Sequence, residues 1–599
     1  MPTAPIDHRP VLAPRSVPLI AEAPRIDGDL GDSVWKSALR SDRFVRFGGD
    51  GSVEEATDAW LATDGNCLYI AFRCHDSAVD KIRVGETQRG GNLADDDHVA
   101  VRLDSQNTHQ AHSIFQVNAA GTQSERLEGG TGSNWTWSGN WSAAVRRDAT
   151  GWNCEMRIPF SMLRYPKGAR GFSLALMRRL GRETNPMVWP EIAREGQTEN
   201  TLSRFLPRFD SPPLPGGRPA PTFLPFVLAS AGDTGRGRVG VDVKLPVSTT
   251  LTGVVALRPD FQTVENDVAQ INFSYNELQV RDQRPFFAEG AEFMPDSDLF
   301  YSRRLSQVDQ GLKLVGRNGN QTIGFIATNA DSGSPDRTSA AVRLEQAFTP
   351  LSRFGFAATA DQREGAPRNR VGRAYGQWGT PIGRRTFAVS GSESTSWIDD
   401  RSAGDASDWQ FSVRDVPGRP VFRYRRSRLD ADFTSNLGLL VDRDRRSEEF
   451  RIGQGYRFDR GPIEIYNVES TYSRAHRQAG AFFYDGWLHT AYVQSWTGIG
   501  FNAGVFRQER AQVAGTIPFA DRIDHVALLW NRRNQFRNGG AAVDSGRQQG
   551  KTYRFRQIEQ GIALGRTVTL RASHAVQQLD SVRTRQTIVT CTWRLTEGD

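Results

Sequence analysis

The sequence predicts an all-β protein, with an amino-terminal β-sandwich followed by a large antiparallel β-barrel of the transmembrane type. Three observations support this fold class. Apolar and polar residues alternate with a period of two along much of the chain, as in VGVDVKLPV at 239–247. A Pro- and Gly-rich stretch divides the chain into two unequal parts. No run of about 18 or more apolar residues occurs, which excludes helical membrane spans.

Length and composition indicate how many domains the protein has and which kinds of partner it could bind. The chain has 599 residues, too many for one hydrophobic core, so we expect at least two domains. Six of the 75 basic residues are lysine, which leaves 75 − 6 = 69 arginines, and the net charge is +7. Arginine forks suit phosphate and carboxylate groups, such as those of lipopolysaccharide or an anionic glycan, although a GC-rich genome explains the same bias. No recognition helix, zinc finger or basic arm is found, which argues against a nucleic-acid partner.

Residues 18–205 form the predicted sandwich. Short strand-like runs separated by Gly, Asn and Asp turns include Leu68–Cys74, His98–Leu103, Trp152–Pro159 and Phe172–Arg178. The cysteines of this region have no metal-type spacing, and we expect them to be small buried hydrophobes. One disulfide among Cys67, Cys74 and Cys154 is the alternative in an oxidising compartment.

Residues 206–221 are the predicted linker, because a segment so rich in proline cannot pair as a central strand. Beyond it, 222–599 repeats alternating runs of about 8–11 residues between polar loops, which is the pattern of an outer-membrane-type barrel with roughly 16–18 strands. A soluble propeller is the alternative, but its signature should recur every ~40–50 residues, and no such repeat is found. The last predicted strand, 587–594, is followed by LTEGD rather than ending on an aromatic residue, which leaves closure of the barrel open.

A long motif in 241–293 identifies a family. It contains Arg258-Pro259-Asp260-Phe261, Val264-Glu265 and Arg284-Pro285-Phe286-Phe287-Ala288-Glu289-Gly290. This region resembles an uncharacterised family of bacterial outer-membrane β-barrels, whose members begin with a domain resembling family-9 carbohydrate-binding modules. The Ile-Asp-Gly motif at 26–28 and Ile158-Pro159-Phe160 resemble that module. The resemblance implies a Gram-negative cell-envelope protein with a carbohydrate-binding sandwich, and it supplies no activity, because none is established for the family.

A tryptophan-rich run is the main candidate for ligand binding. The run 134–141 reads NWTWSGNW, and its candidate ligand-binding residues are Asn134, Trp135, Trp137, Asn140 and Trp141. Sugars stack their C–H faces on indole rings, while short amide side chains bond to their hydroxyls. The alternative is that Trp137 or Trp141 packs beneath a loop at the junction of the two domains.

An acidic run is the candidate metal site. Asp95, Asp96 and Asp97 could supply oxygen ligands to Ca²⁺, which is the one cofactor that the sequence brings into question. The run lacks the spacing of a calcium-binding loop, so a solvated acidic turn is the alternative, with no metal.

Residues 277–310 interrupt the strand pattern and are too charged to face lipid. We expect a long turn or a loop folded into the lumen. Its charged side chains would form a polar network whose members are Arg281, Arg284, Glu289, Glu292, Arg303 and Arg304. Glu289 and Glu292 are also the candidate acid–base pair for glycoside cleavage, which requires two carboxylates about 5–10 Å apart.

Three functions follow from these patterns. The first is binding or uptake of a carbohydrate or other polar ligand, with the barrel as an anchor or a transport conduit in contact with outer-membrane lipid. The second is an enzyme, a glycoside hydrolase or other acid–base catalyst, that uses the carboxylates of 277–310. The third is a structural envelope protein. A barrel with an even number of strands keeps both ends on one side, which places the sandwich in the periplasm. Residues 1–23 carry no signal peptide, so a mature sequence is expected, and a protein retained inside the cell is the alternative.

Overall fold

The structure is a computed structural model, and it describes residues 15–593 with internal gaps. The residues not described within this range are 48–52, 54, 88, 95, 127–139, 182–185, 193–201, 204, 216–220, 230–236, 249, 259–281, 283, 289, 306–307, 332–334, 383–384, 415–419, 441–442, 459–460, 512–517, 533–536 and 565–567.

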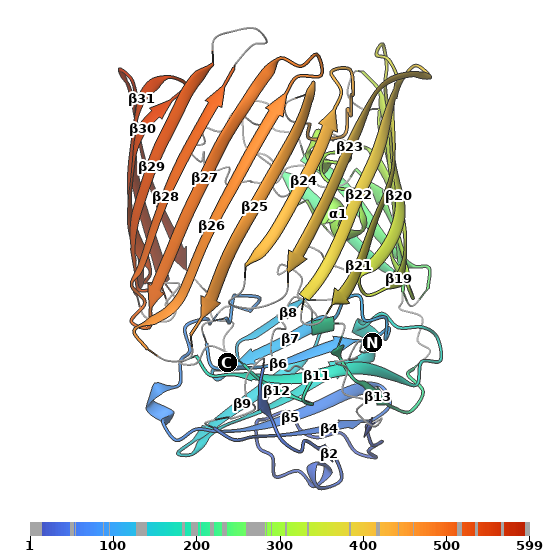
Figure 1. The fold of residues 1–599 in the computed structure, drawn as a ribbon. Helices are drawn as coiled ribbons and strands as arrows, with labels where there is room; N and C mark the ends of the chain where they lie inside the picture. Colours follow the sequence, from blue (N-terminus) through green and yellow to red (C-terminus); the bar gives the residue numbers. More distant parts are fainter. Residues whose placement is uncertain are drawn as a thin grey trace, which may run out of the picture.

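Two sheets packed face to face form the amino-terminal domain, which we call the sandwich (Figure 1). Sheet A has the order β1-β13-β11-β6-β7-β8, with β12 paired to β11 and β3 paired to β12, and sheet B has the order β2-β4-β5-β10-β9. The strands of sheet A are β1 (Arg15–Ser16), β3 (Val45–Arg46), β6 (His98–Asp104), β7 (Ser113–Asn118), β8 (Gln123–Arg126), β11 (Gly171–Arg179), β12 (Met187–Trp189) and β13 (Arg208–Asp210). The strands of sheet B are β2 (Leu39–Arg40), β4 (Thr57–Thr63), β5 (Cys67–His75), β9 (Ser142–Asp148) and β10 (Gly151–Pro159). Three 3₁₀ helices lie in the loops, namely η1 (Ser33–Lys36), η2 (Val79–Lys81) and η3 (Phe160–Met162).

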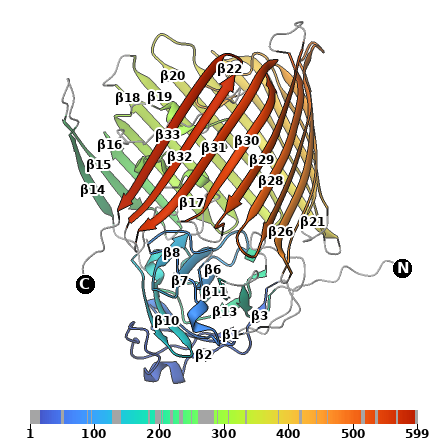
Figure 2. The same ribbon diagram turned by 90° about the vertical axis from the view of Figure 1, so that its left-hand side faces the viewer.

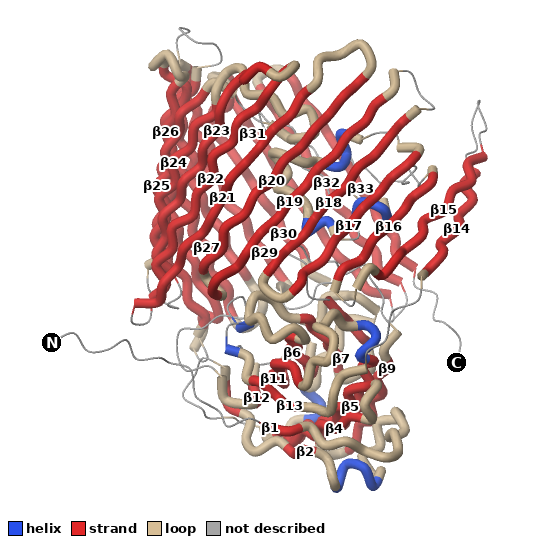
Figure 3. The backbone as a smooth tube through the Cα atoms, turned by 90° about the vertical axis from the view of Figure 1, so that its right-hand side faces the viewer, coloured by secondary structure: helices blue, strands red, loops and turns tan. Residues whose placement is uncertain are grey.

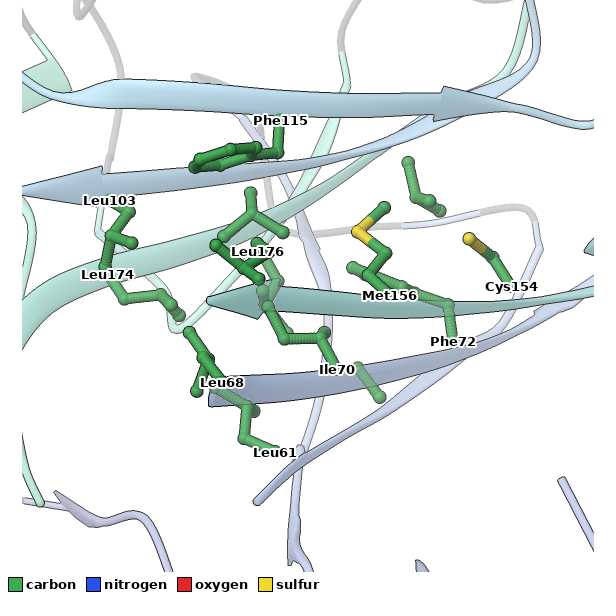
Figure 4. Close-up of a cluster of buried hydrophobic side chains, with 14 of the residues drawn as sticks. Leu61, Leu68, Ile70, Phe72, Leu103, Phe115, Cys154, Met156, Leu174 and Leu176 are labelled. Carbon is green, nitrogen blue, oxygen red and sulfur yellow. The ribbon is translucent and has the colours of Figure 1, made fainter. Parts of the chain in front are cut away.

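Apolar side chains from both sheets fill the space between them (Figure 4). Ile70 and Phe72 of β5 and Leu176 of β11 belong to this buried cluster, as the alternation in their strands requires. Cys74 and Cys154 lie in the same cluster as free thiols, which agrees with the expectation that they are small buried hydrophobes. Burial raises the pKa of the Cys74 thiol to about 12.

The sandwich extends further along the chain than expected. β13 lies inside the predicted linker 206–221, yet Phe209 pairs with Phe172 of β11 and is buried in the core. The sequence pattern missed it because three residues are too few for alternation to be visible. The proline-rich connection therefore begins after Asp210.

The rest of the chain forms one antiparallel sheet of twenty strands, each paired with the next in sequence order, which we call the large sheet. Its strands are β14 (Thr222–Ala229), β15 (Gly237–Pro246), β16 (Leu251–Leu257), β17 (Gln310–Asn318), β18 (Gln321–Ala330), β19 (Arg337–Thr349), β20 (Ser352–Arg363), β21 (Asn369–Ile382), β22 (Arg385–Ile398), β23 (Arg401–Arg414), β24 (Val421–Leu429), β25 (Arg445–Arg457), β26 (Ile463–His476), β27 (Phe482–Ser495), β28 (Gly500–Arg510), β29 (Phe519–Trp530), β30 (Gly539–Gln548), β31 (Lys551–Leu564), β32 (Val568–Leu579) and β33 (Val582–Trp593).

The strand number exceeds the roughly 16–18 expected from sequence because several turns are shorter than assumed. Asp399 and Asp400 alone connect β22 to β23, and both have positive φ, 46° and 67°. Positive φ at both central residues is the backbone of a two-residue type I′ hairpin. Gln549 and Gly550 connect β30 to β31 in the same way, with φ of 55° and 70°.

The large sheet curls round so that its first and last strands return to the same side, while the β14–β15 hairpin flares outward (Figures 2 and 3). Among the described residues, no hydrogen-bonded ladder joins β33 to β14. Closure was left open in the sequence, and the ladder of the large sheet remains open at this seam.

One face of the large sheet is apolar and exposed, and we call it the outer face. Ala357 and Val371 are buried against residues inside the curl, whereas the neighbouring Phe356 points the other way and is 56% exposed. Trp378 (59% exposed) and Val589 (67%) are further outer-face residues. This alternation agrees with the predicted strands, and no second sheet covers these side chains in the described structure. Within the part of the chain that is described, no helix has the length and apolar character of a membrane span.

Residues 282–305 leave the large sheet, whose curved layer of strands we call the wall, and fold inside its curl. We call them the inner segment (Figure 1). They contain the short helices α1 (Pro285–Ala288), η5 (Ala291–Phe293) and η6 (Ser302–Arg304). Phe286, Phe287 and Phe293 are buried against residues of β16 to β19. Of the two expectations for this region, a long turn or an inward loop, the structure has the inward loop.

The sandwich sits at the end of the large sheet where β14 begins (Figure 2), with sheet A nearer to the large sheet than sheet B (Figure 1). Gln110 Nε2 donates to the carbonyl of Thr349 at 3.0 Å, and Arg164 Nη2 donates to Thr252 Oγ1 at 3.4 Å. The Arg164 guanidinium also lies 5.6 Å from the ring centre of Phe293. These contacts join the sandwich to the ends of β19 and β16 in the large sheet and to the inner segment.

Candidate functional site

The first candidate site is the edge of the sandwich formed by β8 and β9, the last strands of sheets A and B. Residues 127–139 connect these strands, so predicted ligand-binding residues Asn134, Trp135 and Trp137 lie outside the described residues. Asn140 directly follows and is exposed. Binding by these four residues therefore stays a prediction.

Trp141 is not an exposed stacking surface. Its side chain is 3% exposed and belongs to the sandwich core. The ring meets Phe115 of β7 edge to face, with centroids 5.3 Å apart and an interplanar angle of 78°. The prediction that Trp141 binds ligand is wrong, because the indole fills the space between the sheets at this edge.

Arg89 lies above Trp141 and was missed in the sequence. Its guanidinium is 6.0 Å from the Trp141 ring centre and 3.5 Å from a carboxylate oxygen of Glu125. The Arg89 side chain is 40% exposed and that of Glu125 only 1%. Gly90 N donates to Gln123 O at 2.8 Å, which holds this loop against β8. A guanidinium fixed by a buried carboxylate and a ring is a preorganised donor for hydroxyl or carboxylate oxygens. Nothing in a lone loop arginine distinguishes it in a sequence.

The acidic run has a structural role at the positions that are described. Asp96 is 4% exposed, and its carboxylate accepts from the backbone of Gly85 (2.6 Å) and Glu86 (3.0 Å). Asp97 is fully buried and accepts from Arg83 N (2.8 Å). The alternative of a solvated turn is therefore wrong at both positions, because these carboxylates fold the loop before β6 onto the sandwich. Among the described residues, no group of three or more His, Cys, Asp or Glu side chains converges. Asp95 lies outside them, so Ca²⁺ stays a prediction.

Sheet A presents buried polar side chains on the face that lies away from sheet B. Gln116 Nε2 is 3.1 Å from His98 Nε2, and His112 Nδ1 is 2.6 Å from Ser203 Oγ. Arg102, also on this face, is 6% exposed. This face points toward the large sheet in Figure 1. Burial, together with the nearby guanidinium groups, lowers the pKa of His112 to about 3.

We expect the sandwich to lose stability as the pH falls below the ordinary histidine pKa of 6.5. The folded domain holds His112 neutral down to about pH 3, while the unfolded chain binds the proton near 6.5. The contribution of His112 to the free energy of unfolding is therefore fully present above pH 6.5. It falls by about 1.4 kcal/mol per pH unit below that pH. Urea unfolding at pH 7 and pH 5 should show about 2 kcal/mol of loss that the His112→Gln variant lacks. Equal losses in both proteins would contradict this assignment.

The predicted lumen network stays a prediction, and its member Arg284 bonds to residues outside the predicted set. Arg284 is 6% exposed and bonds bidentately to Asp282, with a shortest N···O distance of 2.5 Å. It also donates to the carbonyls of Leu305 (2.6 Å) and Ser302 (2.9 Å). Arg281 and Glu289 lie outside the described residues, so the acid–base pair of Glu289 and Glu292 stays a prediction.

Two other predicted members, Glu292 and Arg304, accept hydrogen bonds from arginines of the large sheet through their backbone carbonyls. Glu292 and Met294 accept from Arg343 Nη1 at 3.4 and 3.3 Å through their carbonyl oxygens. Arg304 O accepts from Arg337 Nη1 at 2.7 Å, and Arg303 and Arg304 are themselves half-buried on η6. The inner segment is thus held by wall arginines that the sequence analysis did not single out.

Each of these wall arginines is neutralised by a carboxylate. Arg337 bonds to Asp361 at 2.7 Å, Arg343 to Glu345 at 2.7 Å, and Arg373 of β21 to Asp298 of the inner segment at 2.6 Å. In the sequence these residues are simply the polar positions of alternating strands. The one feature that could have pointed to them is their position in the sequence, because they come soon after the motif region that contains the inner segment.

Two family models match the chain. Residues 26–187 match the model described as "Carbohydrate family 9 binding domain-like", which spans most of the sandwich. The chain thus carries a family-9-like carbohydrate-binding domain. Residues 223–323 match "Domain of unknown function (DUF5916)", which covers β14 to the start of β18 together with the inner segment. The resemblance found in the sequence is confirmed for both regions.

Solved structures are similar to each part. A carbohydrate binding module family 9 from Caldicellulosiruptor kristjanssonii, in complex with cellotriose, is 15% identical and covers 33% of this chain and 93% of its own, with a TM-score of 0.26. A putative carbohydrate-binding protein from Bacteroides uniformis is 12% identical and covers 34% and 98%, with a TM-score of 0.27. The P pilus usher translocation pore is 9% identical and covers 83% and 93%, with a TM-score of 0.27. Comparison with curated proteins gives no match.

Proposed function

We propose that the protein binds a carbohydrate through its family-9-like domain and is anchored in the outer membrane by the large sheet, which acts as a barrel. The observation that carries the binding function is the family match over 26–187. The edge at β8 and β9 supports it, because Arg89 offers a fixed and partly exposed donor there, and Trp135 and Trp137 lie between these two strands in the sequence. Polar donors next to aromatic rings are what saccharide recognition requires.

The outer face supports the membrane location. Large apolar side chains such as Phe356, Trp378 and Val589 would each be left in water if the protein were surrounded by solvent. Contiguous apolar surface of this extent marks contact with a membrane or a partner. The polar network of the inner segment lies on the opposite face of the same wall, as in a barrel with a polar interior.

Topology supports a periplasmic sandwich and a role in uptake. With twenty strands, the large sheet begins and ends at the side that carries the sandwich. In bacterial outer-membrane barrels both ends of the sheet lie in the periplasm. A ligand held on the sandwich would then lie next to the end of the lumen, where Gln110 and Arg164 contact the large sheet.

The test is saccharide binding by the full chain in detergent, with cellotriose and glucose as first probes and a panel of soluble oligosaccharides to follow. We expect the double variant Trp135→Ala/Trp137→Ala, and separately Arg89→Ala, to weaken binding about tenfold or more, since each removes a direct contact. Trp60→Ala is the matched control, because Trp60 lies on sheet B beneath the Arg40 guanidinium, 5.8 Å away. Absence of saccharide binding by the wild type, or equal loss in the Trp60 variant, would overturn the proposal.

A further inference from the structure

The outer face of the last strands is divided into two bands. Near the sandwich end its side chains are apolar, as at Phe501, Leu528 and Ile562. Toward the far end of these strands, which Figure 2 shows side by side, the outward positions of β28 to β31 and β33 are repeatedly arginine by strand register and exposure. These exposed arginines are Arg507, Arg522, Arg547, Arg554, Arg556, Arg583 and Arg585.

The strand register brings like charges side by side. Arg507 pairs directly with Arg522 across β28 and β29, and Arg522 pairs directly with Arg547 across β29 and β30. Directly opposed residues have Cβ atoms about 4.5–5.5 Å apart, and like charges at that distance are destabilising. Arg556 and Arg585 lie in a second row, separated only by Val576 of β32. A row of this kind is stable when an anion lies between the guanidinium groups.

Carboxylates of the protein balance these rows only in part, because Glu509 and Asp524 are the two acidic residues at outward positions of β28 and β29. Arg522 reaches Asp524 at 3.2 Å, but among the described residues no ion pair is found for the other six arginines. The outer face of β24 to β26 is different at the same level, because Arg474 pairs with Glu448 (2.5 Å) and Arg428 with Asp430 (2.8 Å). The unbalanced charge is therefore a local property of β28 to β33.

We propose that the outward arginine rows of β28 to β33 bind the phosphate groups of anionic membrane lipids. This rests on the proposed membrane location and adds a ligand class to it. A charge at the level of the acyl chains costs about 2–4 kcal/mol, so the rows must lie at headgroup level, directly beyond the apolar band. Guanidinium groups bind phosphate in bidentate geometry, and the adjacent apolar side chains receive the acyl chains. That adjacency favours a lipid over a soluble anion.

The experiment compares two double variants of the full chain that remove equal charge. Arg507→Gln/Arg547→Gln removes the two arginines of the first row that have no described ion pair, and Arg428→Gln/Arg474→Gln removes two that are paired. Phosphatidylglycerol is titrated into each protein in neutral detergent and bound lipid is counted by native mass spectrometry. We expect the first variant to bind about tenfold more weakly and the second to remain close to wild type.

Inorganic phosphate provides the second arm of the test. We expect it to compete with phosphatidylglycerol only at far higher concentration, because it lacks the acyl chains. Equal competition would identify a bare anion site and overturn the lipid assignment, as would equal loss of binding in the two variants. Insertion into phosphatidylcholine nanodiscs separates the two proposals. A protein that inserts but does not select phosphatidylglycerol refutes this inference alone, whereas one that fails to insert refutes the membrane location as well.

Discussion

Replacing Arg178 with alanine is expected to destabilise the sandwich strongly and leave the large sheet folded. The Arg178 side chain is completely buried, as is that of its partner Asp76, 3.7 Å away. Its guanidinium donates to the carbonyls of Ala56 (2.9 Å) and His75 (2.7 Å), so it joins β11 of sheet A to sheet B. Removing one member of a buried ion pair costs about 3–5 kcal/mol, because the other charge stays buried without compensation. A domain of this size has only about 5–15 kcal/mol in total.

Scanning calorimetry and limited proteolysis of the full chain measure this effect. We expect the sandwich transition to move down strongly or disappear in Arg178→Ala, while heat-modifiable gel mobility reports on the large sheet. The control is Arg208→Ala, which removes an exposed arginine of β13 paired with Asp210 at 2.9 Å, and it should change stability by less than about 1 kcal/mol. Equal transition temperatures in the two variants would show that the buried pair does not hold the sheets together.

The second large effect is expected from Gly324→Ala, which should release the inner segment from the wall. A Cβ atom at Gly324 would lie 2.0 Å from the carbonyl oxygen of Phe293, which is backbone and cannot move aside alone. We expect η5 to leave its place and the backbone after Arg303 and Arg304 to become accessible to trypsin. Cleavage there should be about tenfold faster, since local opening exposes otherwise protected backbone.

The matched control for this prediction is Gly504→Ala on β28. There the nearest atom to a new Cβ is the His489 carbonyl oxygen at 3.4 Å, which is ordinary contact. We expect its trypsin pattern to equal that of wild type, and planar-bilayer conductance should rise only in Gly324→Ala. Slow cleavage in both variants would mean that the inner segment is held by its arginine contacts and not by the close approach at Gly324.

The sequence predicted the architecture because alternation is a local signal. A period of two assigns each residue of β15 and β16 to one of two faces without knowledge of the partner strand. The exposed apolar outer face and the polar inner face follow from that one rule. The strand number was underestimated because turn length depends on backbone geometry, as at Asp399 and Asp400, and not on hydropathy.

Side-chain partners could not be predicted in the same way. Trp141 was a ligand-binding candidate because three tryptophans lie close together in the sequence, with packing as the alternative, and the ring meets Phe115 from a different strand. Arg284 bonds to Asp282, two residues away, and its contact with Leu305 depends on how the inner segment folds back. Such contacts arise from tertiary packing, which periodicity does not encode.

The seam between β14 and β33 has a consequence for how the wall would come apart. In hydrocarbon, each peptide N–H or C=O without a partner costs several kcal/mol. The two facing strand edges are therefore the part of the surface where unpaired backbone groups cost the most free energy. In the described residues these edges lack a shared ladder, whereas every other strand has neighbours on both sides. Under heat or pulling force, disassembly should start at this line and peel the strands away one after another, rather than in a single cooperative step.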